Sequence, residues 1–221
     1  MARALVIGAS GGIGQALVAA LRARGDAVTG LSRSVDGLDV TDETSISAAL
    51  APLTAPFQTV IVATGALEIM GAAPEKSLAR LDPSALAAQF ALNSIGPALV
   101  LKHALRLLPR DAPARFAVLS ARVGSIGDNR LGGWYSYRAA KAALNQLVHT
   151  AAIEIARTHP QAVVACLHPG TVATPFTEKY LGTHPAVRPD EAAQNLLAVL
   201  DSLTPAQTGG FFDWQGKAVP W

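Results

Sequence analysis

Tyr137 and Lys141 place a phenol and an ammonium four residues apart, in a stretch with the pattern of a helix. Side chains at this spacing lie on one face of a helix, so the two groups can converge. A neighbouring positive charge lowers the pKa of a phenol and makes it a better proton donor or acceptor near neutral pH. A packed tyrosine beside a solvated lysine is a common alternative, so the pair alone is only a candidate for acid–base chemistry.

A glycine-rich turn near the start of the chain is the second candidate site. The run GASGGIG, from Gly8 to Gly14, follows an apolar strand-like segment and precedes an amphipathic helical segment. Glycines let backbone N–H groups approach a pyrophosphate, and the N-terminus of the next helix adds partial positive charge. The spacing Gly8-x-x-x-Gly12-x-Gly14 differs by one residue from the common dinucleotide fingerprint. The flanking elements favour dinucleotide binding over a purely structural turn.

The end of the second predicted strand indicates which dinucleotide binds. An acid at this position would hold the ribose 2′-hydroxyl of NAD, but the chain has Ser32 and Arg33 there. The Arg33 guanidinium can pair with the 2′-phosphate of NADP, and Ser32 adds a donor. The sequence therefore predicts that NADP(H) is preferred and NAD(H) is possible. The alternative is that Arg33 is a solvated surface residue.

Short β-rich runs alternate with longer helical patterns, which is typical of βαβ units and a parallel sheet. Runs such as Val60-Ile61-Val62 are continuously apolar, as expected of strands covered on both faces. The predicted fold is one α/β domain over residues 1–221, with a doubly wound parallel sheet and an edge strand from residues 209–217. Strands are expected near 3–7, 27–31, 58–63, 115–120 and 162–167, and helices near 12–24, 44–50, 83–107, 136–157 and 189–201.

The composition argues against macromolecular and membrane partners. Half of the 221 residues are hydrophobic and 15% are charged, which supplies a large core. The net charge of +2 comes from residues of both signs spread along the chain, without the basic cluster of a nucleic-acid footprint. No run approaches the roughly 18 apolar residues of a membrane span. The segment from Met1 to Gly8 is predicted to be a first strand instead of a signal peptide.

The cysteine and histidine content predicts neither a disulfide nor a metal centre. Cys166 is the single cysteine and lies in an apolar run, so it is expected to pack as a small hydrophobe in a cytoplasmic protein. His168 is expected to have a solvent-facing ring at a strand end. The remaining histidines lack metal-ligand spacing and are predicted to be surface or helix residues: His103, His149, His159 and His184.

Several motifs occur together in an order known from one family. The chain resembles the short-chain dehydrogenases/reductases over nearly its whole length, which implies a single Rossmann domain with an integral substrate site. The features that carry the resemblance are the glycine turn, Asp39-Val40 after the family's third strand, Ala63-Thr64-Gly65 after its fourth, Asn93-Ser94-Ile95-Gly96, Tyr137 with Lys141, and Pro169-Gly170-Thr171-Val172-Ala173-Thr174.

A narrower resemblance is to the C-factor and sniffer-type carbonyl reductases. It rests on the segments GSIGDN (124–129), GWYSYR (133–138) and the terminal VPW (219–221). The long helical stretches near 83–107 and 136–157 are rich in small residues and are similar to those that pair between family subunits. The resemblance therefore implies a homodimer or homotetramer that acts on a small carbonyl or alcohol.

The resemblance also assigns roles to single residues. Tyr137 would protonate the carbonyl oxygen as hydride arrives, Lys141 would hold the nicotinamide ribose, and Asn93 would anchor a water that relays protons to Lys141. The alternative for Asn93 is a residue at a helix kink. The implied cofactor-binding positions are Gly8, Ser10, Gly12, Ile13, Gly14, Ser32, Arg33, Asp39, Val40, Ala63, Thr64, Gly65, Tyr137, Lys141, Pro169, Gly170, Val172 and Thr174.

One position departs from the family pattern. The catalytic serine normally begins a Ser-x-x-Gly run after the fifth strand, and Gly124 places that position at Ala121. Ser120 is one residue away, and strand alternation would point its side chain away from the pocket. Ser125 is the better replacement candidate, although it is equally well explained as a turn residue.

The predicted function is hydride transfer between NADPH and an aldehyde or ketone, from the pro-S face as the resemblance implies. Tyr137 would act as the acid in reduction and as the base in oxidation. A different class of protein, a low-turnover nucleotide-binding sensor, is favoured by Ala121 and disfavoured by the intact Tyr137 and Lys141. The short segment 175–188 predicts an open site, and it does not specify the substrate.

Overall fold

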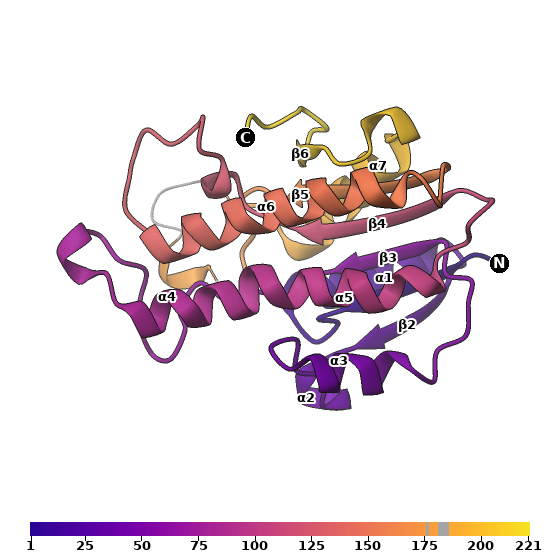
Figure 1. Ribbon diagram of the computed structural model, residues 1–221, viewed down its shortest axis with the longest axis horizontal. Helices are drawn as coiled ribbons and strands as arrows, with labels where there is room; N and C mark the ends of the chain where they lie inside the picture. The colour runs from indigo at the N-terminus through magenta and orange to yellow at the C-terminus, as the bar shows by residue number, and fades with distance from the viewer. Residues whose placement is uncertain (176, 181–185) are drawn as a thin grey trace.

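Six strands of the described chain form one parallel sheet (Figure 1). The computed structural model describes residues 1–175, 177–180 and 186–221, so His184 and part of segment 175–188 lie outside the described residues. The order across the sheet is β2-β1-β3-β4-β5-β6. The strands are β1 (Arg3–Ile7), β2 (Ala27–Leu31), β3 (Thr59–Val62), β4 (Ala114–Leu119), β5 (Ala162–His168) and β6 (Phe211–Asp213).

The strands confirm the sequence prediction, including β6 as the edge strand within residues 209–217. One expectation was wrong, because Asp39-Val40 does not follow a strand. After β2 the chain forms a single-turn helix, α2 (Arg33–Asp36), which ends at Gly37 with a φ of 70°. Residues 37–42 then run without strand pairing to the next helix. Val40 nevertheless packs into the core, so this stretch still closes the β2 side of the fold.

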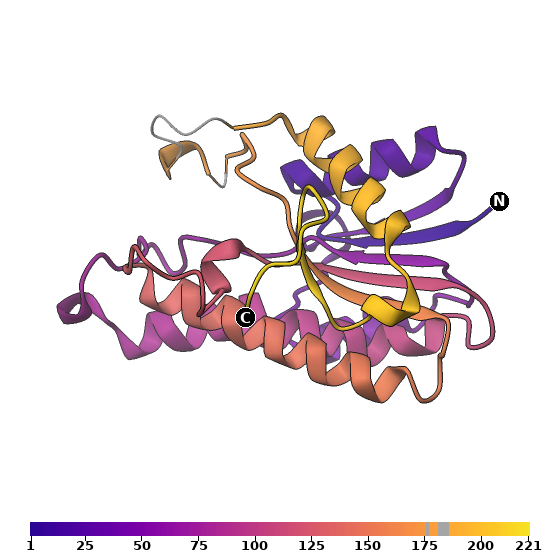
Figure 2. The same cartoon turned by 90° about the horizontal axis from the view of Figure 1, so that it is seen from above.

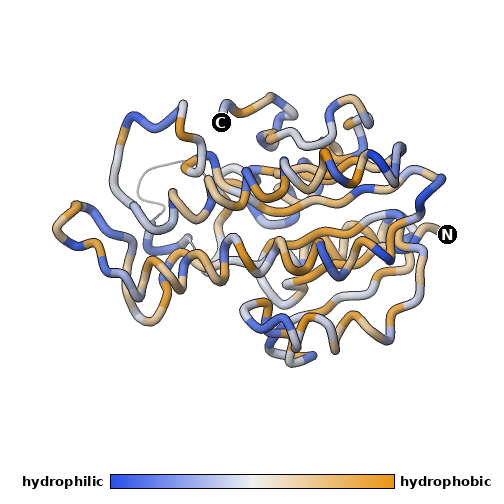
Figure 3. The backbone as a smooth tube through the Cα atoms, viewed as in Figure 1, coloured by the Kyte–Doolittle hydropathy of each residue, from blue (hydrophilic) through white to orange (hydrophobic). Residues whose placement is uncertain are grey.

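Alternating side chains of the strands build an apolar core on each face of the sheet. In β1, Leu5 and Ile7 pack toward one face and Val6 toward the other. Figure 2 shows helices on both sides of the sheet. Figure 3 shows that hydrophobic residues follow the central strands. The doubly wound prediction is thus confirmed. The first face is covered by α3 (Glu43–Leu50), α5 (Gly96–Ala104) and α6 (Tyr135–Ile155), and the second by α1 (Gly12–Ala23) and α7 (Pro189–Ser202).

Cys166 lies in the core on the α6 side of the sheet, as predicted. Its side chain is 1% exposed. Burial raises the pKa of the thiol to about 12, because an apolar environment disfavours the thiolate. The sulfur is therefore a packing group at neutral pH.

The helical stretch predicted over 83–107 is divided into pieces. It contains α4 (Pro83–Phe90), a π-turn over Ala91–Ile95, α5, and a 3₁₀ turn over Leu105–Leu107. By length and hydropathy alone this stretch would suffice to cross a membrane, contrary to the sequence expectation. In the fold α4 packs against α6 and α5 packs against β3, which gives its apolar residues a protein partner. The π-turn contains Asn93, and such turns often occur at functional sites.

The carboxyl ends of the strands meet at one edge of the sheet. The chain order reverses at β1, which has β2 on one side and β3 on the other. Ligands of open α/β sheets bind in the crevice at this kind of reversal. The loops that follow β1, β3, β4 and β5 therefore supply the residues of any site there.

Helix α6 approaches the loop after β4 very closely at Gly124. A Cβ built on Gly124 would lie 2.7 Å from the Lys141 Cβ and 2.8 Å from the Lys141 carbonyl carbon. Both are shorter than van der Waals contact, and the backbone of a helix cannot yield as a side chain can. Gly124 thus sets how near the candidate Lys141 lies to the end of β4.

We expect Gly124→Ala to destabilise the fold by about 1–3 kcal/mol, because overpacking a close backbone contact forces a shift of helix or loop. Gly11→Ala is the matched control, since the nearest atom to a Cβ there would be the Gly8 carbonyl oxygen, at an ordinary contact distance of 3.5 Å. Urea unfolding of both variants measures the effect. Equal midpoints for the two variants and the unaltered protein would contradict this account of the contact.

Candidate active site

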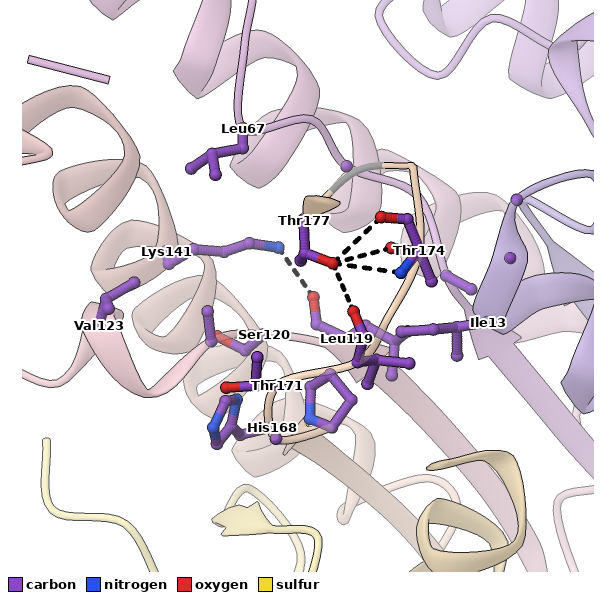
Figure 4. Close-up of a pocket in the computed structure, with 18 of the residues that line it drawn as sticks. Ile13, Leu67, Leu119, Ser120, Val123, Lys141, His168, Thr171, Thr174 and Thr177 are labelled. Carbon is purple, nitrogen blue, oxygen red and sulfur yellow. Dashed lines mark hydrogen bonds between the residues drawn. The ribbon is translucent and has the colours of Figure 1, made fainter. Parts of the chain in front are cut away.

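A cavity of about 650 Å³ opens at the carboxyl edge of the sheet. Its size is within the range of small-molecule sites. Figure 4 shows side chains from several strand ends and from α6 converging on it. Of the predicted site residues, the lining includes Ser10, Gly12, Ile13, Ala63, Thr64, Gly65, Tyr137, Lys141, Pro169, Gly170, Val172 and Thr174. The predicted residues outside the lining are Gly8, Gly14, Ser32, Arg33, Asp39, Val40, Asn93 and Ser125.

The glycine turn needs glycine for close backbone contacts. Gly8 has a φ of 87°, and a Cβ there would lie 2.9 Å from the Ala63 carbonyl. A Cβ on Gly14 would lie 2.1 Å from the Gly8 carbonyl oxygen. Gly12 faces Thr174, whose Cγ2 would be 2.8 Å from an added Cβ. These three positions therefore have no room for a side chain. Thr174, in the loop after β5, lies against the turn at Gly12.

Tyr137 and Lys141 both line the cavity from α6. Both side chains are buried, and the Lys141 Nζ lies 5.8 Å from the centre of the Tyr137 ring. Burial raises the pKa of the Tyr137 phenol above its usual value, in contrast to the lowering expected from the neighbouring ammonium. Burial lowers the pKa of Lys141 to about 8, so it is mostly protonated at pH 7. The predicted acid and its cationic neighbour are brought together.

Hydrogen-bonding groups in the cavity fit a ligand that carries hydroxyls. Lys141 Nζ donates to the Leu119 carbonyl at 2.8 Å, which uses one of its three donors (Figure 4). The Thr64 hydroxyl is buried in the lining without a partner in the protein. An unsatisfied buried hydroxyl is costly, so a ligand group is its natural partner. The residues present thus fit the sugar of a nicotinamide dinucleotide.

The side chain of Asn93 is held by protein groups, and its role as a water anchor stays a prediction. Its Nδ2 donates to the Ala66 carbonyl at 2.9 Å and to Gln89 at 2.5 Å, and its Oδ1 accepts from the Ala66 N–H at 3.1 Å. These contacts engage the side-chain amide with protein groups, and Asn93 does not line the cavity. The π-turn places it under the loop after β3. Asn93 thus lies at the irregular turn of the helix, as the kink alternative expected, and from there it holds that loop.

The structure corrects the expectation that Ser125 replaces the missing serine. The Ser125 hydroxyl donates to the Pro220 carbonyl and accepts from the Asp128 N–H, so it is turned toward the C-terminal segment. Ala121 lines the cavity at the position where the family pattern has a serine. Ser120 also reaches the lining, but its hydroxyl donates to the Asn145 amide oxygen at 2.6 Å. The cavity thus has no hydroxyl at position 121 and gains none from Ser125.

The region beyond β2 contains an acid that the sequence reasoning missed. Arg33 is exposed at the start of α2, as a phosphate-binding residue should be. Asp36, one turn later, accepts from the Ser32 N–H at 2.7 Å and from its hydroxyl at 3.3 Å. The Ser32 hydroxyl in turn accepts from Val35 as the cap of α2. A carboxylate therefore lies beside the two donors expected for a 2′-phosphate.

Asp39 lies in a turn on the same side of the fold. Its Oδ1 accepts from the N–H of Thr41 at 2.8 Å and from its hydroxyl at 2.7 Å. These hydrogen bonds hold the pKa of the Asp39 carboxyl below its usual value, so it is ionised at neutral pH. Val40, next to it, is buried and in contact with Gly96. The pair is fixed in place, and its role toward adenine stays a prediction.

Two histidines differ from their predicted positions. His168 lines the cavity, and its Nδ1 is buried without a hydrogen-bond partner in the protein. Burial, aided by the Arg122 cation, lowers the pKa of His168 to about 4, so the ring is neutral at pH 7. His159 is only 4% exposed, although a surface or helix position was expected. Its ring accepts or donates a hydrogen bond with the Thr158 hydroxyl at 2.9 Å.

Part of the cavity wall is apolar and aromatic, and sequence reasoning missed it. The Trp134 ring stands edge-on to Tyr137 at 6.3 Å and to Tyr180 at 5.7 Å. Leu67 and Val123 complete this wall. The aromatic residue after two glycines was a usable signal for Trp134. Nothing local to Leu67 or Tyr180 distinguishes them from ordinary loop residues.

Two loops are joined next to Tyr180, which lines the cavity. Lys179 lies 3.1 Å from Glu68, and the Tyr180 hydroxyl donates to the same carboxylate at 2.8 Å. These bonds connect the loop after β3 to the segment after β5. Within the described residues, the predicted open site is therefore bridged at this point.

Comparison with known proteins gives concordant matches. A family model described as short chain dehydrogenase matches residues 2–184 of the chain. The 1-hydroxy-2-glutathionyl-2-methyl-3-butene dehydrogenase of Rhodococcus sp. (strain AD45) is 30% identical over an alignment of 233 positions, which covers all of both chains. The C-signal protein of Myxococcus xanthus is 36% identical over 146 residues, covering 66% of this chain and 84% of its own.

Solved structures share the fold. The NADPH-bound carbonyl reductase from chicken fatty liver superimposes with a TM-score of 0.85 at 24% identity, covering 99% of this chain and 94% of its own. The carbonyl reductase Sniffer of D. melanogaster superimposes with a TM-score of 0.82 at 18% identity and covers all of both chains. At these identities the likeness establishes the architecture and strand order.

The surroundings of Arg33 generate a binding prediction. We expect Arg33→Ala to remove most of any preference for NADPH over NADH, because the guanidinium is the cation available to the 2′-phosphate. Asp36→Asn should tighten NADPH by about two- to fivefold and leave NADH nearly unchanged, since it removes an exposed like charge. Fluorescence titration of both nucleotides measures these changes. Equal affinity of the unaltered protein for the two nucleotides would refute the role of Arg33.

Proposed function

Because this chain belongs to the short-chain dehydrogenase family, we propose that it is an NADP(H)-dependent oxidoreductase that reduces an aldehyde or ketone, with Tyr137 as the general acid. The observation that carries the proposal is the placement of buried Tyr137 and Lys141 in the same cavity as the glycine turn. A dinucleotide held by the turn would extend toward this pair. No other cluster in the described lining combines a proton donor with a cation on one element.

The proton chemistry follows from the environment of the pair. NADPH, when bound, supplies the hydride for the reduction. Tyr137 is protonated at neutral pH, because burial raises the pKa of its phenol. It can therefore donate a proton to a carbonyl oxygen on which negative charge develops. The Lys141 ammonium stabilises the phenolate that remains, and its free donors can hold sugar hydroxyls.

The other lining residues position the ligands. Thr64 offers its unpartnered hydroxyl near Gly65, where a side chain would collide with Asn93 at 2.8 Å. Thr174 closes over Gly12 from the loop after β5. The aromatic wall that contains Trp134 lies against the Tyr137 ring. A preference for NADPH supports the reductive direction, because cellular NADP pools are mostly reduced.

The proposal includes a homodimer or homotetramer as the working assembly. Three large apolar side chains, Ile95, Leu147 and Ile153, are about half exposed on the π-turn and on α6. These belong to the helical stretches that sequence similarity associates with subunit pairing. A second copy would cover them.

One observation favours a second candidate function. Ala121 leaves Tyr137 without the hydroxyl that usually helps to orient the carbonyl, which suits a nucleotide-binding sensor with little turnover. The two functions predict different results when the protein is mixed with NADPH and a panel of carbonyls. Oxidation of NADPH supports the reductase, whereas binding without oxidation supports the sensor.

Replacing Tyr137 with Phe tests the proposed acid. We expect Tyr137→Phe to bind NADPH with unchanged affinity and to lose about 10²–10⁴-fold in kcat, since general acid catalysis is typically worth that much. Steady-state NADPH oxidation and fluorescence titration give the two quantities. Near-normal carbonyl reduction by the variant would show that another group donates the proton.

The hydroxyl missing at position 121 gives a paired prediction. Ser125→Ala should lower the melting temperature and leave kcat within about twofold, because its hydroxyl bonds Pro220 and not the cavity. Ala121→Ser should raise kcat by about tenfold or more, since a donor to a developing oxyanion is worth up to about 10²–10³-fold. Rates with one good carbonyl substrate decide the matter. A large loss of kcat in Ser125→Ala would restore Ser125 as the replacement.

A further inference from the structure

Helix α6, which carries the proposed acid, has no cap from its own sequence. It begins at Tyr135, and Trp134 before it makes no side-chain hydrogen bond to the first turn. The first turn also contains no acidic residue. The first N–H groups of a helix need acceptors, and a buried helix start without them is unstable. The acceptors for α6 must therefore come from elsewhere in the chain.

Glu75, 61 residues earlier in the sequence, supplies one of them. One carboxylate oxygen accepts from the Ser136 N–H at 3.1 Å, and the other accepts from the Ser136 hydroxyl. Glu75 is 8% exposed. Burial opposes its ionisation, but the hydrogen bonds from Ser136 and from the backbone of Glu75 itself together hold the carboxyl pKa below its usual value. Two shorter helices, α3 and α4, are capped instead by the residue just before each helix, Asp42 and Asp82.

The backbone of Glu75 holds a second element of the site. Its carbonyl accepts from the Trp134 N–H at 2.5 Å. Trp134 has a φ of 52° and a ψ of 42°, a left-handed conformation that is strained for a large side chain. Such a residue persists only where its surroundings fix it. The same acid thus holds the helix start and the aromatic wall that stands edge-on to Tyr137.

We propose that Glu75 is a positioning residue of the active site. Through Ser136 it fixes the first turn of α6 and so the position of Tyr137. Through Trp134 it fixes the aromatic wall that lies against Tyr137. The loop that contains Glu75 is held at its other end by Asn93, through Ala66. The loop after β3 therefore connects the π-turn to the first turn of α6. This inference rests on the proposed function for its effect on rate, but its structural part does not.

The experiment compares Glu75→Ala, Glu75→Gln and Asp82→Ala. Asp82→Ala is the matched control, because it removes a carboxylate cap from α4, where Asp82 accepts from Ala85 at 2.8 Å, without touching the cavity. For Glu75→Ala we expect kcat to fall at least about tenfold and the carbonyl KM to rise, with NADPH affinity within about twofold of the original. Glu75→Gln, which keeps an acceptor oxygen of the same reach, should recover most of kcat. Asp82→Ala should lower the melting temperature and keep kcat and KM.

A second measurement needs no substrate. Hydrogen–deuterium exchange at the first turn of α6 should be at least about tenfold faster in Glu75→Ala than in the unaltered protein, and near normal in Glu75→Gln and Asp82→Ala. Unchanged exchange there would overturn the proposal. Equal losses of kcat in Glu75→Ala and Asp82→Ala would also overturn it, because they would reduce its effect to general stability. A protein that exchanges as expected but reduces no carbonyl would count against the proposed function alone.

Discussion

The buried ammonium of Lys141 is the constraint around which the site is organised. A charge removed from water must be given acceptors, and Lys141 has the Leu119 carbonyl at the end of β4 at 2.8 Å. Two glycines leave the space that this requires. Gly124 admits the helix at Lys141 itself, and Gly65 leaves room within 3.7 Å of the ammonium. The end of β4, helix α6 and the loop after β3 thus all lie next to this one cation.

Much of the architecture could be predicted because it follows from local pattern. Continuously apolar runs marked β3 and β5, and glycine spacing marked the turn before α1. The stretch over 83–107 reads as one helix because its residues are uniformly apolar and small. Its division at Asn93 depends on hydrogen bonds to Ala66, which no helical periodicity reports. The short α2 in place of a strand was hidden for a similar reason, since Asp36 folds back on Ser32.

The same distinction applies to the site: residues on one helix could be paired from the sequence, whereas residues with distant partners could not be oriented. Tyr137 and Lys141 could be paired from spacing alone, because both lie on one helix. The direction of the Ser125 hydroxyl could not, since its partner at Pro220 is 95 residues away. The neutral His168 was missed because its environment is made by strand neighbours that the sequence does not reveal. Partners distant in sequence determine the orientation of these polar side chains. The local sequence pattern predicts only the secondary-structure element on which each side chain lies.

The contact between the loop after β4 and the C-terminal segment has a consequence for the order of folding. The Gly127 N–H donates to the Trp221 carbonyl at 2.7 Å, beside the Ser125 bond to Pro220. Trp221 is itself seated by stacking on Phe211 of the edge strand. Closing so long a loop carries an entropic cost before any contact repays it. The active-site loop is therefore expected to settle only after the edge strand has docked, which makes its shape one of the last features of the molecule to form.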